Sequence, residues 1–133
     1  MQKVKVRILI KTIMKRILST ITILLFLVST KLSSQIVKNM NTDLEEFIKN
    51  ESKEGGKFDF KNTVEKYDGA FIAFDKILYN KKDFTILMWG AAVHQTGIKD
   101  FEKAQLLWEE INHRKLTEPE LKALKKGVET KLQ

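Results

Sequence analysis

The chain has 133 residues, of which 43% are apolar, and a formal net charge of +7. This length allows one small domain, and a positive charge of this size is typical of proteins that bind nucleic acids or acidic membranes. The sequence contains no cysteine. Disulfides, zinc–thiolate sites, thiol nucleophiles and a cysteine-linked lipid anchor are therefore excluded.

The positive charge is concentrated at the N-terminus. Residues 1–34 contain no Asp or Glu but seven basic residues, which are Lys3, Lys5, Arg7, Lys11, Lys15, Arg16 and Lys31. Without these seven, 17 of the 24 basic residues remain, which equals the 17 acidic residues, so residues 35–133 are neutral overall. A neutral domain lacks the basic surface that nucleic-acid binding requires. We therefore expect no nucleic-acid partner.

Residues 14–35 have the features of a secretory leader. Lys15 and Arg16 precede an uncharged run over residues 17–30. As a helix this run would be about 21 Å long, which is shorter than the roughly 30 Å hydrocarbon core of a bilayer. It resembles the apolar region of a bacterial secretory signal peptide. The small residues Ser33 and Ser34 then supply a cleavage site before Gln35.

This resemblance implies that residues 1–34 are a cleaved signal peptide and that residues 35–133 are exported, either to the periplasm or into the medium. The membrane would then be a partner only transiently. Met14 is a natural start for such a leader, in which case residues 1–13 are an upstream extension. The alternative is an uncleaved leader that anchors the protein in the membrane.

The remaining sequence predicts five helices and an all-α fold. Thr42 and Glu45 form a capping-box pattern at the start of the first helix, and Thr117 and Glu120 form another at the start of the fifth. Apolar residues at spacings of three and four define the buried stripes of the others. The expected ranges are residues 42–51, 63–79, 84–95, 100–113 and 117–132.

The second and fourth predicted helices share a pattern at an offset of 34 residues. Tyr67, Ala70, Phe74 and Ile77 correspond to Phe101, Ala104, Trp108 and Ile111. This period over about residues 64–113 resembles the tetratricopeptide repeat, in which pairs of antiparallel helices stack. A helical bundle unrelated to that family is the alternative.

The resemblance implies an array of antiparallel helical hairpins, closed by a C-terminal capping helix. In such repeats the first helix of each hairpin lines the partner-binding face. The resemblance therefore nominates Leu87, Ala91 and His94 as residues that face a partner.

Glu110 and His113 form an E-x-x-H pattern of the kind that di-iron bundles use. Such a site needs a second pair, but the other histidine, His94, has Ala91 three residues before it. The pattern is more typical of a polar helix end, where basic side chains suit the helix dipole. Trp89 and Trp108 lie on apolar faces, which predicts core positions for both.

We therefore expect an exported, non-catalytic helical protein that needs no cofactor and binds a protein or peptide. An interaction module, an inhibitor or an immunity-type protein would fit this description. The alternatives are a metal-binding bundle or small enzyme that uses Glu110 and His113, and a membrane-anchored helper that keeps its leader.

Overall fold

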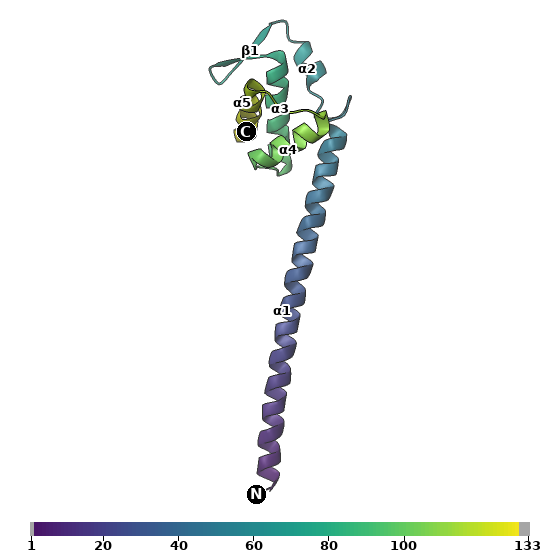
Figure 1. Ribbon diagram of the computed structural model, residues 1–133, viewed down its shortest axis with the longest axis vertical. Helices are drawn as coiled ribbons and strands as arrows, with labels where there is room; N and C mark the ends of the chain where they lie inside the picture. The colour runs from purple at the N-terminus through teal and green to yellow at the C-terminus, as the bar shows by residue number, and fades with distance from the viewer. Residues whose placement is uncertain (1, 131–133) are drawn as a thin grey trace. The chain divides into compact units, whose positions relative to one another are not determined.

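The computed structural model describes residues 2–130, which form five helices and one two-stranded sheet (Figure 1). The elements are α1 (Gln2–Glu51), α2 (Lys61–Glu65), β1 (Phe71–Phe74), β2 (Ile77–Asn80), α3 (Lys81–Thr96), α4 (Phe101–Asn112) and α5 (Glu118–Glu129). The chain divides into two units, Met1–Thr42 and Asp43–Gln133. The mostly helical structure confirms the expected class in its coarse form, but the sheet was not expected.

The helix α1 is continuous over 50 residues and contains neither glycine nor proline. The helix start expected at Thr42 is therefore wrong. The Thr42 hydroxyl donates a hydrogen bond to the carbonyl oxygen of Lys38 (3.0 Å) within the helix, and does not cap a new one. Extending an existing helix costs less than nucleating another, and no residue in this stretch interrupts the extension.

The N-terminal part of α1 exposes its apolar side chains. Every side chain that the structure describes between Gln2 and Asp43 is exposed. Among the described residues, α1 is the one helix long and apolar enough to cross a membrane. A signal sequence close to the N-terminus satisfies the same two criteria, so length and composition fit both the cleaved leader and the retained anchor.

The helix expected over residues 63–79 is wrong, because α2 ends at Glu65 and an antiparallel hairpin follows. In this hairpin Ile72 pairs with Tyr79, and both side chains are buried. The residues on either side of each are exposed, so burial around Ile72 and Tyr79 alternates as expected for a strand that covers a core with one face.

The turn of the hairpin explains why the sequence did not reveal it. Asp75 and Lys76 both have left-handed backbones, with φ of 47° and 64°. Two such residues make the turn that matches the twist of a hairpin, but this turn usually contains glycine or asparagine. In this chain neither residue is present at the turn, so the strongest local signal is missing.

Because of the hairpin, the 34-residue offset does not relate two helices. Residues 67–77 include β1, whereas residues 101–111 lie within α4. The first member of the proposed repeat pair is therefore not a helix in this stretch. Membership of the tetratricopeptide family stays a prediction.

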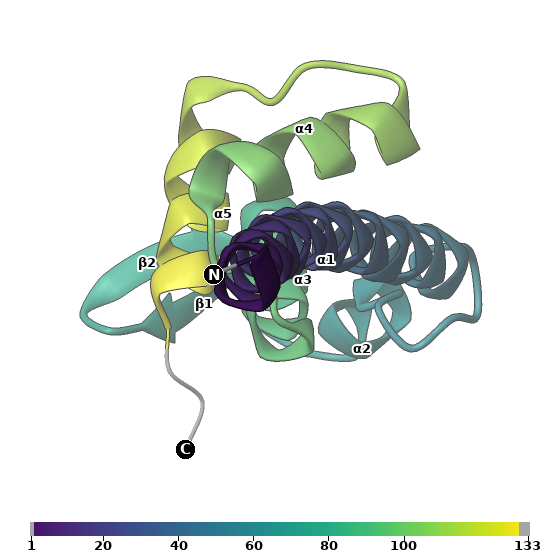
Figure 2. The ribbon, with the colours of Figure 1, turned by 90° about the horizontal axis from the view of Figure 1, so that it is seen from below.

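The core of the second unit is built around α3. The helix α5 runs alongside α3, and the hairpin and α4 lie on different sides of this pair, as Figures 1 and 2 show. The last turns of α1 add Ile48, whose side chain is completely buried. The main cluster consists of Ile48, Ile86, Trp89, Val93, Ile98, Ala104, Leu107, Trp108, Leu116, Leu124 and Val128.

The backbones of α3 and α5 approach each other closely at two glycines, one in each helix. A Cβ atom added to Gly127 would lie 2.1 Å from the carbonyl oxygen of Leu87 and 3.0 Å from the amide nitrogen of Ala91. One added to Gly90 would lie 2.8 Å from the carbonyl oxygen of Leu124. Neither backbone can move away without opening the core, so both positions require glycine.

We expect Gly127→Ala to lower the free energy of unfolding of residues 35–133 by about 3 kcal/mol, because the added methyl group pushes α5 away from α3. Urea unfolding followed by tryptophan fluorescence measures this loss. Lys125→Ala, at an exposed position of the same helix, is the control and should change stability by less than about 0.5 kcal/mol. Equal stability of the two variants would contradict the close contact.

Candidate binding cleft

The second unit contains an open cleft of about 470 Å³. Its apolar wall comes from the loop before α2 and from α3 and α4, and consists of Phe58, Phe60, Ile86, Trp89, Trp108 and Ile111. We call this site the tryptophan cleft. Clefts of this size with aromatic walls and a few polar groups are the usual form of a binding site.

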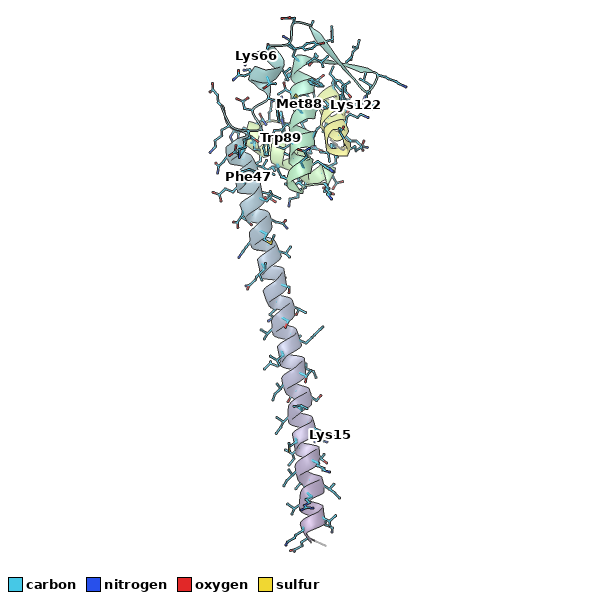
Figure 3. All side chains as sticks on the ribbon, turned by 180° about the vertical axis from the view of Figure 1, so that it is seen from behind. Lys15, Phe47, Lys66, Met88, Trp89 and Lys122 are labelled. Carbon is cyan, nitrogen blue, oxygen red and sulfur yellow. The ribbon has the colours of Figure 1, made fainter. Side chains whose placement is uncertain are left out.

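The two tryptophans confirm the expectation that they lie in the core, since their exposed fractions are 4% for Trp89 and 6% for Trp108. Trp89 lies midway along α3 (Figure 3) and donates its indole N–H to the hydroxyl of Ser52 at 2.8 Å. Ser52 in turn donates to the carbonyl oxygen of Ile48 (2.7 Å). This chain of hydrogen bonds fixes the orientation of the Trp89 ring.

The rim of the cleft is fixed by Arg114. Its guanidinium group lies over the Trp108 ring, 4.5 Å from the ring centre, which is a favourable cation–π distance. The same group donates two hydrogen bonds of 2.8 Å to the carboxylate of Glu120. Arg114 therefore links α4 to the first turn of α5 while it covers one edge of the cleft.

Glu120 is a buried carboxylate with three partners. Its side chain is 1% exposed and also accepts the amide N–H of Thr117 at 2.8 Å and contacts Lys82 at 2.9 Å. The hydrogen bond from Arg114 is the main reason why the pKa of Glu120 lies far below its usual value, even though burial acts in the opposite direction. The predicted capping box of Thr117 and Glu120 is confirmed.

The charged groups around the cleft are largely paired. Lys81 lies 3.7 Å from Glu65, and Lys82 and Arg114 both contact Glu120. Asp59 and Lys61 also line the cleft, so that with Glu120 the site has four basic and three acidic groups and little net charge to attract a ligand. The arrangement therefore favours an apolar or aromatic group as the main ligand of the cleft.

Two of the three residues nominated as partner-facing line a groove that is separate from the tryptophan cleft. Leu87 and Ala91 are each 3% exposed and line a separate apolar groove of about 340 Å³ with Phe74 and Phe84. His94 is half-buried and is not among the residues that line this groove. Its Nδ1 atom has no hydrogen-bond partner among the described residues. A role in partner binding stays a prediction for all three.

Glu110 and His113 are both exposed at the end of α4. Glu110 forms an ion pair with Lys49 at 2.5 Å. His113 has a left-handed backbone (φ 51°) and terminates the helix. Within residues 2–130, no group of three or more His, Cys, Asp or Glu side chains could hold a metal ion. The pair therefore has no additional protein ligand in this part of the chain.

The loop before α2 contributes to the cleft, which the sequence-based expectations did not include. The ring of Phe58 packs edge-on against Phe47 of α1, with ring centres 6.0 Å apart. The amide N–H groups of Lys57 and Phe58 donate to the side chain and the carbonyl oxygen of Glu51, each at 2.9 Å. The loop itself contains two phenylalanines, Phe58 and Phe60, among polar residues and glycines. They were the signal in the sequence that this loop packs against the core.

Comparison with known proteins gives no further guide to the site. No protein-family model matches the chain, and no curated protein or solved structure is significantly similar to it.

The lowered pKa of Glu120 predicts a loss of stability in acid. Below the ordinary glutamate pKa of 4.5, the unfolded chain takes up a proton at this position while the folded chain keeps it charged. The stabilisation is therefore complete above this pH and is lost as the pH falls through the lowered pKa of Glu120. We expect Glu120→Gln to cost about 2 kcal/mol at neutral pH and to reduce the acid dependence.

Unfolding measured from neutral to acidic pH tests this expectation. Glu118→Gln is the matched control, because Glu118 lies in the same turn of α5 but its side chain is 74% exposed. The control should follow the unaltered protein at every pH. If both variants show the same pH dependence, Glu120 does not carry the effect.

Proposed function

We propose that the protein is an exported, non-catalytic helical protein that binds a protein or peptide partner. The observation that carries this proposal is the tryptophan cleft, which offers aromatic walls held in fixed orientations. Buried aromatic pockets of this kind accept the anchor side chains of protein partners. We infer that an apolar or aromatic side chain of the partner enters the cleft between Trp89 and Trp108.

The distribution of buried residues supports export after removal of the leader. The side chains that build the core begin at Leu44, which is partly buried, and continue with Ile48. A cut between Ser34 and Gln35 therefore leaves the core of the second unit complete. The product would be neutral, since residues 35–133 contain equal numbers of basic and acidic residues.

A membrane-anchored helper is the second candidate, and the continuity of α1 favours it. The helix runs from Gln2 to Glu51 without a break at the expected cleavage site. The cations at residues 3–16 precede the apolar run, which would place the N-terminus in the cytoplasm and the second unit outside.

The tryptophans themselves report on the cleft, because the chain contains two and both line it. We expect peptides selected by display against residues 35–133 to change the tryptophan fluorescence on binding. Ile111→Lys places a charged chain in the cleft and should weaken the affinity at least about tenfold, since burying an unpaired charge is costly.

Leu106→Lys is the control for this experiment. It makes the same substitution on the same helix, at a side chain that is 64% exposed and does not line the cleft. Thermal unfolding confirms that both variants are folded. Peptides that bind Ile111→Lys as tightly as the unaltered protein, or that fail to bind Leu106→Lys, would place the binding surface elsewhere.

Determining the N-terminal residue of the protein isolated from a bacterial host distinguishes the exported protein from the membrane-anchored helper. We expect Gln35 or its cyclised form. Ser34→Tyr should block the cut, because the residue before a signal-peptidase site must be small, whereas Ser33→Tyr at the tolerant middle position should not. Recovery of the full chain from the membrane, with no processed form, would favour the anchored helper.

A further inference from the structure

The first turns of α1 form an amphipathic segment. Lys3, Arg7, Lys11 and Lys15 follow one another at intervals of four residues in a continuous helix and therefore lie on one side of it. We call these four residues the basic face. All four are exposed, and Figure 3 shows Lys15 on the surface of α1.

A second set of residues lies on another side of the same segment. Val6, Leu9, Ile10 and Ile13 have the spacing of an apolar helix face, and their exposed fractions are 54%, 60%, 50% and 48%. We call these four residues the apolar face. No other described part of the chain covers it.

The charges of the basic face are not neutralised within the chain's own N-terminal region. Residues 1–34 contain no Asp or Glu, so an acidic side chain three or four positions away is missing along this whole segment. The cations are therefore available to an external anion. Lys5 and Arg16 add two further positive charges to the segment.

We propose that residues 3–16 bind the anionic headgroups of a lipid bilayer. A helix with a basic face and an apolar face lies in the membrane interface, where cations contact lipid phosphates and apolar side chains enter the acyl boundary. Clusters of four to eight basic residues next to a membrane segment are attracted to anionic lipids.

The continuation of α1 favours a lipid surface over other polyanions. After Arg16 the helix continues through the uncharged residues 17–30, whose apolar side chains are exposed on all sides. A nucleic acid would pair with the cations but would leave these side chains in water. A bilayer satisfies both parts of the helix at once.

This proposal does not depend on the tryptophan cleft, because it concerns the other unit of the chain. In a chain that loses residues 1–34, the segment acts before the cut. In a chain that keeps them, it holds the anchor against the anionic leaflet.

The test uses the full chain in neutral detergent micelles, titrated with dioctanoyl-phosphatidylglycerol and with dioctanoyl-phosphatidylcholine. We expect the anionic lipid to bind at least about tenfold more tightly, and its affinity to fall as salt is added. Equal binding of the two lipids would overturn the proposal.

The basic face is tested by the variant K3Q/R7Q/K11Q/K15Q, which should lose the preference for the anionic lipid. The control K66Q/K99Q/K122Q/K125Q removes the same number of charges from exposed positions in the second unit and should keep it. The conservative variant K3R/K11R/K15R should also keep it. If the basic-face variant binds the anionic lipid normally, or if the control loses as much affinity, the basic face is not the site.

Discussion

The structure of the second unit depends on the contact between α3 and α5 at Gly90 and Gly127. Since no side chain separates the two backbones there, α5 lies close along one side of α3 and adds Leu124 and Val128 to the core. The other sides of α3 remain free for different neighbours. One receives the hairpin, through Tyr79 and the aromatic contacts of Phe84, and another presents Trp89 to the cleft. An apolar helix can pack on several sides at once, and α3 therefore holds the other elements of this small unit together.

Two buried carboxylates connect α4 to α5 and thereby shape the cleft. Glu109 accepts hydrogen bonds from Lys115 and from the amide N–H of Leu116, and the contact with Lys115 is the main reason why its pKa lies below the usual value. Glu120 holds Arg114 in the same short connection. Because both ends of this connection are fixed, the Arg114 side chain is held over Trp108. The position of the cleft's rim thus follows from ion pairs that local sequence patterns do not encode.

The parts of the fold that could be predicted are those in which local and tertiary signals agree. The capping box at Thr117 and the apolar stripes of α3 and α4 gave correct helices because caps and buried faces act within a few residues. The last helix ends at Glu129, before the expected residue 132, which lies outside the described residues. The hairpin was missed because the spacings between Tyr67 and Leu78 satisfy a helical period, and the turn contains no glycine. Tertiary packing of Ile72 and Tyr79 decides between these periods. The site shows the same division: the burial of both tryptophans was predictable, but the contacts of Phe58 and Arg114 were not.

The exposed apolar surface of α1 and the closed core of the second unit impose different requirements on one chain. Side chains such as Leu24, Leu25 and Phe26 are 65%, 64% and 71% exposed, and apolar area left in water costs roughly 25 cal/mol per Å². This part of the helix therefore requires either a bilayer or removal. The second unit has neither requirement, because its buried side chains come from residues 48 onward. The division explains why a chain with a strongly basic composition contains a neutral domain: the excess positive charge lies in residues 1–34, the part of the chain that we propose meets the membrane.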